Sequence, residues 1–137
     1  MSRTIVDSGP LVAWFCPRDV HHAWVVEVFQ TLGRGCLTCE SVFFEVCHLA
    51  AKEGVPPDRV LGEVERGGMV IMPLTGEIAA LRLLLQQYRD INIDFADACV
   101  VRLAEFHRES QVCTTDTDFR VYRRQGREVI PLLAPFG

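Results

Sequence analysis

The sequence predicts a three-layer α/β domain with a mainly parallel central sheet flanked by helices. Short apolar segments alternate with longer segments of helical spacing, and no tight hairpin is expected between the apolar segments. Continuous apolar runs are typical of parallel strands, because helices cover both faces of such a sheet. A length of 137 residues fits a single domain, residues 1–137, and a hydrophobic content of 49% supports a buried core.

Five apolar segments have the composition of buried strands, and they are residues 3–6, 35–38, 69–74, 112–115 and 129–133. Six segments have helical spacing, and they are residues 11–15, 20–32, 40–53, 57–66, 76–88 and 94–107. The Ser8-Gly9-Pro10 sequence is expected to break the chain after the first strand, while Asp19 and Thr75 are expected to cap helices. Pro57 suits the first turn of its helix, where an N–H would have no partner.

Composition argues against several classes of protein. The chain has no apolar run of about 20 residues, as a membrane-spanning helix requires, and Asp7 interrupts the apolar stretch that a signal peptide needs. A cytoplasmic location with no membrane partner is therefore expected. The six cysteines are expected to be free and buried, because Cys36 and Cys39 lack a second pair at zinc spacing. A net charge of −4 argues, taken alone, against a nucleic-acid partner.

Acidic residues are expected to gather at one edge of the predicted sheet. Asp7 ends the first strand and Asp116 follows the fourth, and the carboxyl ends of parallel strands meet at the edge where ligands bind. Glu45 lies mid-helix beside two phenylalanines, where a carboxylate is costly unless it faces a polar site. The full set of acids is Asp7, Glu45, Asp94, Asp97, Asp116 and Asp118.

A carboxylate cluster of this kind is tolerated when a cation or protons offset its charge. Oxygen ligands without nearby His or Cys suit Mg²⁺ or Mn²⁺, and such ions activate water for hydrolysis of a phosphodiester bond. Each acid also has an ordinary structural interpretation. Asp94 and Asp97 fit a capping box, Asp116 fits an Asx turn, Asp7 fits a simple turn, and Glu45 fits a solvated helix face.

Four segments that contain these acids resemble, in order, the PIN-domain nucleases, and among them the VapC-like toxins of type II toxin–antitoxin systems. The segments are Ile-Val-Asp7-Ser-Gly-Pro-Leu-Val-Ala, Thr-Cys-Glu40-Ser-Val-Phe-Phe-Glu45-Val, Ile-Asp94-Phe-Ala-Asp97-Ala-Cys and Thr-Thr-Asp116-Thr-Asp118-Phe-Arg-Val-Tyr-Arg. They span nearly the whole chain. The resemblance implies a PIN-like α/β fold and a divalent-metal ribonuclease site that uses Mg²⁺ or Mn²⁺.

The resemblance also implies roles for individual residues. The catalytic acids are Asp7, Glu45, Asp97 and Asp116, and the auxiliary residues are Asp94, Asp118, Ser8 and Thr115. Asp7 and Asp97 are expected to bind the metal directly, because a central strand and a helix N-terminus hold them rigidly. The implied partners are an RNA substrate, a cognate antitoxin protein and a second copy of the chain.

A basic stretch follows the last acids. Arg120, Arg123 and Arg124 are expected to meet RNA phosphates at the rim of the site, although a solvated basic turn has the same sequence. Setting six site acids aside leaves 12 of 18 acidic residues against 14 Lys and Arg, so the remaining chain is not acidic.

The function expected from these features is that of a metal-dependent endoribonuclease and toxin. A catalytically silent PIN-fold binding module, or a PIN nuclease of RNA maturation or DNA processing, would carry the same acids. An aspartyl phosphatase is disfavoured, because Gly9 stands where its second acid belongs. A response-regulator receiver is disfavoured, because the single lysine, Lys52, is on the wrong element.

Overall fold

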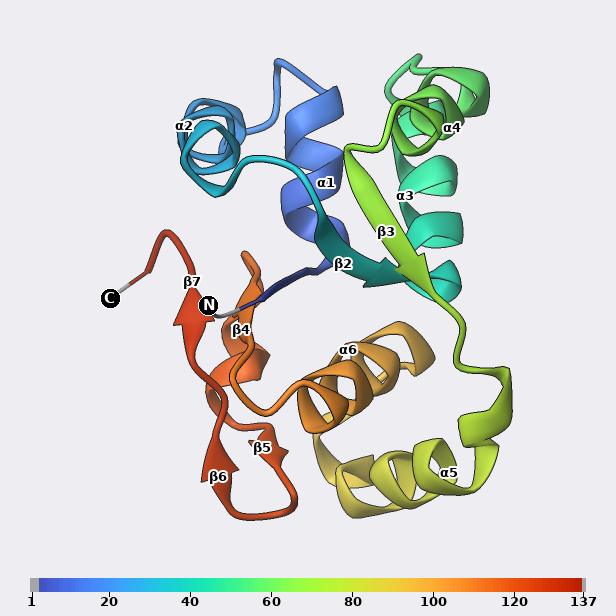
Figure 1. Cartoon of the computed structure of the whole chain (residues 1–137), viewed down its shortest axis with the longest axis vertical. Helices are drawn as coiled ribbons and strands as arrows, with labels where there is room; N and C mark the ends of the chain where they lie inside the picture. The colour runs from blue at the N-terminus through green and yellow to red at the C-terminus, as the bar shows by residue number, and fades with distance from the viewer. Residues whose placement is uncertain (1–2, 137) are drawn as a thin grey trace.

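The computed structural model describes residues 3–136 and has a five-stranded parallel sheet between two layers of helices, which confirms the predicted fold class (Figure 1). The sheet contains β1 (Thr4–Val6), β2 (Cys36–Cys39), β3 (Met69–Met72), β4 (Gln111–Cys113) and β7 (Leu132–Leu133). Its strand order is β3-β2-β1-β4-β7, and every neighbouring pair is parallel. The first strand therefore lies at the centre of the sheet.

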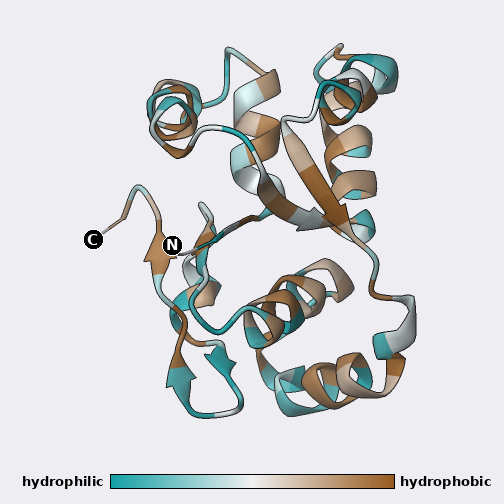
Figure 2. Cartoon of the chain, in the orientation of Figure 1, coloured by the Kyte–Doolittle hydropathy of each residue, from teal (hydrophilic) through white to brown (hydrophobic). Residues whose placement is uncertain are grey.

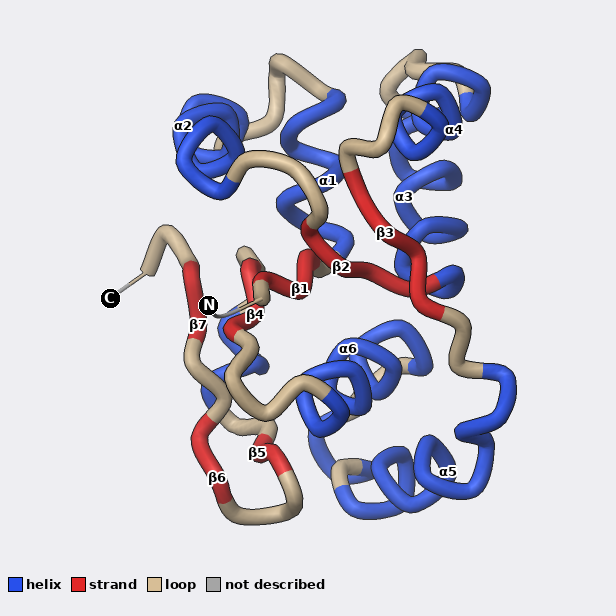
Figure 3. The backbone as a smooth tube through the Cα atoms, in the orientation of Figure 1, coloured by secondary structure: helices blue, strands red, loops and turns tan. Residues whose placement is uncertain are grey.

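Helices cover both faces of this sheet (Figure 3). One layer contains α1 (Ser8–Phe15), α2 (His22–Leu32), α3 (Glu40–Lys52) and α4 (Pro57–Glu65). The other layer contains α5 (Ile78–Gln87) and α6 (Phe95–Phe106). Three short 3₁₀ turns are η1 (Thr75–Glu77), η2 (Arg89–Ile91) and η3 (Thr117–Arg120). Figure 2 shows hydrophobic residues along β3 and β7, as expected for strands that contact the core.

Helix α6 is held against the sheet by small and β-branched side chains. Seven of its 12 residues are buried, and they are Ala96, Ala98, Cys99, Val100, Val101, Leu103 and Ala104. Alanines let the helix backbone approach the strands closely, so α6 packs between the sheet and α5. This packing fixes the first turn of α6, which carries Asp97, beside the carboxyl end of β1.

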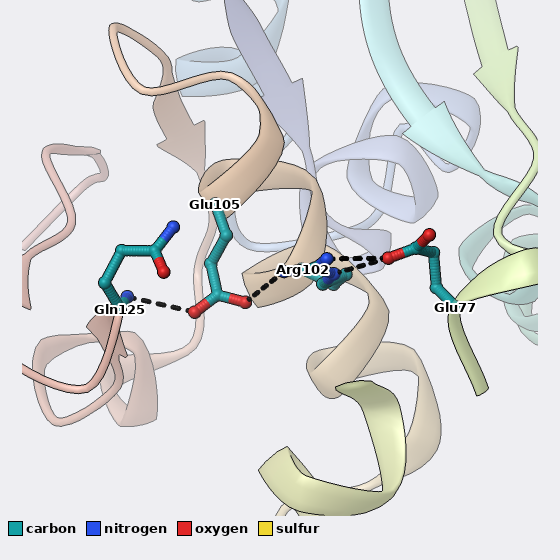
Figure 4. Close-up of polar contacts among 4 residues, drawn as sticks. All are labelled: Glu77, Arg102, Glu105 and Gln125. Carbon is teal, nitrogen blue, oxygen red and sulfur yellow. Dashed lines mark hydrogen bonds and ion pairs between the residues drawn. The ribbon is translucent and has the colours of Figure 1, made fainter. Parts of the chain in front are cut away.

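A polar network centred on Arg102 and Glu105 of α6 restrains the rotation of this helix (Figure 4). The Arg102 Nε donates to Glu77 Oε1 at 2.8 Å, and Arg102 Nη1 donates to Glu105 Oε1 at 3.1 Å. The other carboxylate oxygen of Glu105 accepts from the Gln125 N–H at 2.9 Å. The network joins α6 to η1 and to the C-terminal hairpin, so these two elements hold α6 in one orientation.

The C-terminal segment differs from the prediction. A tight antiparallel hairpin forms from β5 (Arg123–Arg124) and β6 (Glu128–Val129), so the expectation of no hairpin is wrong. Residues 125–127 connect the two strands, and Gln125 and Gly126 have φ values of 54° and 76°, the left-handed pair of a type I′ turn. The Arg127 N–H closes this turn by donating to the Arg124 carbonyl at 3.2 Å. The predicted strand 129–133 is divided between β6 and β7 at Pro131, which has no N–H to donate.

Three helix starts also differ from the prediction. Residues 8–10 do not break the chain but form the first turn of α1, where Pro10 needs no hydrogen-bond acceptor. Asp19 caps the turn before α2, since its Oδ1 accepts from His21 N at 2.9 Å, and α2 itself begins at His22. Thr75 begins η1 rather than capping α5 with its side chain.

Two expectations from composition can be compared with the structure. No helix among residues 3–136 is long and apolar enough to cross a membrane. All six cysteines are free, as predicted. Cys16, Cys39, Cys99 and Cys113 are buried, whereas Cys36 and Cys47 are half-buried.

Candidate active site

The predicted acids gather where the strand order of the sheet reverses. The chain moves from β1 to β2 on one side of the sheet and later returns to place β4 on the other side. Ligands bind parallel sheets at such switch points, outside the carboxyl ends of the strands. Asp7 follows β1 and Asp116 follows β4, and the Asp7 N–H donates to the Cys113 carbonyl at 2.9 Å. The topology therefore brings these two acids together.

Asp7 is a buried acid with one unpartnered oxygen. Its side chain is 3% exposed, and Thr114 Oγ1 donates to its Oδ2 at 2.8 Å. Its Oδ1 is buried and has no hydrogen-bond partner among the described residues. Burial raises the pKa of Asp7 to about 7, the Thr114 hydroxyl and the nearby Ser8 backbone N–H lower it, and the charges of Asp116 and Glu45 raise it further.

Gly9 allows α1 to begin close to the end of β4. A Cβ atom at this position would lie 2.1 Å from Thr115 Oγ1, well inside any permitted contact. Because α1 begins at Ser8, directly after Asp7, this close approach brings Thr115 beside the first turn of α1. Thr115 therefore packs against the backbone of α1.

Asp94 and Asp97 divide two roles between them. Asp94 is the N-cap of α6, and its Oδ1 accepts from Asp97 N at 2.8 Å, as in the structural interpretation. The Asp97 carboxylate does not complete a capping box, because Tyr122 Oη donates to its Oδ2 at 3.1 Å. Burial raises the pKa of Asp97 to about 7, and the charges of Asp94, Asp7 and Asp116 raise it as well.

Glu45 reaches the same site from α3. It is half-buried, and Ser8 Oγ donates to its Oε1 at 3.3 Å. Burial raises the pKa of Glu45, with a smaller contribution from the charge of Asp94. The solvated-face interpretation therefore does not describe this side chain, which links α3 to the first residue of α1.

Asp116 lies at the rim of the site in an Asx turn. Its Oδ1 accepts from Asp118 N at 2.9 Å, while its own N–H donates to Thr114 Oγ1 at 3.0 Å. The structural interpretation of Asp116 is thus confirmed, and its charge still acts on Asp7 and Asp97. Asp118 is exposed and lies one turn further out.

The arginines predicted to meet RNA have different environments. Arg124 is only 4% exposed, so it does not lie at the rim as expected. Its guanidinium donates to the Arg108 carbonyl and to the Ser110 carbonyl, the latter at 2.7 Å. Arg123 Nη1 donates to three backbone carbonyls of residues 120–122. Arg120 is exposed, with its guanidinium 4.4 Å from the centre of the Phe136 ring.

Two residues of the site were not predicted from the sequence. Thr114 bridges Asp7 and Asp116, and the paired threonines directly after a buried strand were a usable signal for it. Tyr122 contacts Asp97 from 25 positions further along the chain, and no local pattern indicated that contact.

The acids fit a divalent cation in donor type and charge. All are hard oxygen donors, and Asp7 Oδ1 lacks a hydrogen-bond partner among residues 3–136. Besides burial, the charges of neighbouring carboxylates help to raise the pKa values of Asp7 and Asp97, and a cation would offset that repulsion. No group of three or more His, Cys, Asp or Glu side chains in residues 3–136 is already arranged to hold a metal ion.

No protein-family model matches the chain, and no curated protein matches it in sequence.

Proposed function

We propose that the chain is a divalent-metal-dependent endoribonuclease that hydrolyses RNA phosphodiester bonds, acting as the toxin of a toxin–antitoxin pair. The observation that carries this proposal is the buried Asp7, whose Oδ1 has no hydrogen-bond partner in the described part of the chain, at a switch point shared with Asp97, Asp116 and Glu45. Like charges in a poorly solvated site destabilise the folded protein, whereas a bound cation is attracted by every one of them.

Asp7 and Asp97 are the proposed ligands of Mg²⁺ or Mn²⁺. When bound, the ion offsets negative charge on the scissile phosphate and lowers the pKa of water for attack at phosphorus. Glu45 and Asp116 are half-buried and so reach solvent, where they can accept hydrogen bonds from water and orient it. The raised pKa of Glu45 also brings it closer to neutrality as a proton acceptor.

The remaining features support the proposed partners. Arg120 and Arg123 follow Asp116 and Asp118, and we place RNA phosphates against the exposed Arg120. A cleft of about 620 Å³ is lined mainly by apolar residues, including Leu11, Trp14 and Phe29, and this is where we place an apolar segment of the antitoxin. The proposal includes a homodimer and a cytoplasmic location.

The test is cleavage of single-stranded RNA by purified protein with Mg²⁺ or Mn²⁺ and with excess EDTA. We expect cleavage only with the ion, and its loss in Asp7→Asn and Asp97→Asn. Asp58→Asn is the matched control, because Asp58 is an exposed acid in the first turn of α4. Cleavage that persists in EDTA would exclude the metal mechanism. Absence of cleavage in a folded wild type that binds Mn²⁺ would favour a silent binding module, and preferential cleavage of DNA would favour DNA processing.

A further inference from the structure

Tyr122 is a buried tyrosine whose hydroxyl contacts the active-site acid Asp97. Its side chain is 0% exposed, and its Oη donates to Asp97 Oδ2 at 3.1 Å. A buried hydroxyl without a partner is destabilising, so a tyrosine here is favourable only because Asp97 accepts its hydrogen bond. We propose that Tyr122 is a positioning residue, whose hydroxyl holds the Asp97 carboxylate toward Asp7. This inference rests on the proposed function.

The surrounding aromatic rings fix the place of the hydroxyl. The Tyr122 ring contacts Phe119 edge-to-face at 5.0 Å and Tyr88 edge-to-face at 5.1 Å between ring centres. The Tyr88 ring makes this contact, while its hydroxyl oxygen accepts from the Arg123 N–H at 2.9 Å. The place of the Tyr122 hydroxyl is therefore set by the rings of Tyr88, directly after α5, and of Phe119 in η3, while Asp97 is anchored by α6.

Asp97 needs such a partner because three negative charges oppose its orientation. The carboxylates of Asp94, Asp7 and Asp116 lie near enough to act on Asp97 electrostatically, so its ionised carboxylate is repelled by each of them. An ionised Asp97 that rotates away from Asp7 lowers this repulsion. The hydrogen bond from Tyr122 opposes that rotation and occupies Oδ2, while Oδ1 has no hydrogen bond among residues 3–136. The second oxygen thus stays available for a cation.

The closing experiment compares Tyr122→Phe with Tyr88→Phe. Both variants keep the ring and its packing, but only Tyr122→Phe removes a hydroxyl that contacts an acid. We expect Tyr122→Phe to weaken Mn²⁺ binding, measured by calorimetry, by about 10-fold, as loss of an outer-shell partner does. Tyr88→Phe should bind Mn²⁺ within about twofold of the wild type. In an Asp97→Asn background, Tyr122→Phe should cause no further loss of Mn²⁺ affinity.

A second readout separates this inference from the proposed function. Three-bond NMR couplings report the χ1 rotamer of Asp97 in metal-free protein at pH 8. We expect a single rotamer in the wild type and in Tyr88→Phe, and rotamer averaging in Tyr122→Phe. If the wild type binds no Mn²⁺, the nuclease proposal fails, and the couplings alone decide the role of Tyr122. Unchanged couplings in Tyr122→Phe, or unchanged Mn²⁺ affinity in a wild type that binds the ion, would overturn the inference.

Discussion

Replacing Asp7 with Asn should stabilise the metal-free protein at neutral and alkaline pH. The pKa of Asp7 lies at about 7 in the folded protein, against an ordinary value of 3.8. Between these values the folded state holds a proton that the unfolded state has released, so stability falls as pH rises from about 4 to about 7. Above that window the full penalty of the buried charge is present, and the uncharged amide avoids it.

The size of the effect follows from the pKa and from the contacts of the carboxyl group. The difference between 3.8 and about 7 corresponds to about 4 kcal/mol, since one pKa unit is about 1.4 kcal/mol. The amide oxygen of Asn can still accept from Thr114, but its NH₂ group enters the place of Oδ1, where no partner exists, at a cost of about 1–3 kcal/mol. We therefore expect a net gain of about 1–3 kcal/mol at pH 8.

The assay is urea unfolding in EDTA, followed by circular dichroism at pH 8, 6 and 4. The advantage of Asp7→Asn over the wild type should shrink steadily as pH falls and should vanish or reverse at pH 4, where little of the charge penalty remains. Asp58→Asn, at an exposed acid, should show no comparable change with pH. If Asp7→Asn is less stable than the wild type by the same amount at all three pH values, the Asp7 side chain serves the fold, and the charge argument is refuted.

Three further changes test neighbouring parts of the structure. Asp97→Asn should raise or preserve the melting temperature of the metal-free protein at pH 8, because its pKa is also raised to about 7; a fall of many degrees would assign it to helix capping. Gly9→Ala should lower the unfolding free energy by about 1–3 kcal/mol in urea, because its Cβ would lie 2.1 Å from Thr115 Oγ1; an unchanged value would contradict that contact. Arg124→Ala should lower the unfolding free energy by about 2–4 kcal/mol, since two carbonyls lose a charged donor. A weakened RNA affinity at unchanged stability would instead support the predicted role of Arg124 in RNA binding.

The fold could be predicted because the main strands and helices have strong local patterns. Apolar runs that alternate with helical stripes specify a parallel sheet, and the chain order places the first strand centrally. The hairpin β5–β6 could not be predicted in the same way, because each of its strands is only two residues long and carries no periodicity. Its turn also depends on the left-handed conformation of Gln125, a residue that rarely adopts it.

The acids of the candidate site could be predicted from the sequence, but their hydrogen-bond partners could not. Asp94 and Asp97 are three residues apart at one helix start, so either can serve the helix or the site. Tyr122, a residue distant in sequence, contacts Asp97 and leaves Asp94 as the cap. The burial of Arg124 could not be predicted either, because a run of arginines normally indicates a solvated surface. The carbonyls that accept hydrogen bonds from Arg124 belong to a different segment of the chain.

The position of Asp7 gives an argument for a charged ligand that does not depend on any resemblance. A carboxyl group at the end of a central strand, with one oxygen buried and unpartnered, makes the folded protein less stable than an amide would. Residues that break local rules of stability are expected at functional sites, where a ligand gains from them. A cation bound at Asp7 stabilises the folded state by mass action, and it competes there with a proton. Stabilisation by Mn²⁺ should therefore be greater at pH 8 than at pH 6, and it should disappear in Asp7→Asn. A melting temperature that does not respond to Mn²⁺ at either pH would refute a cation site at Asp7.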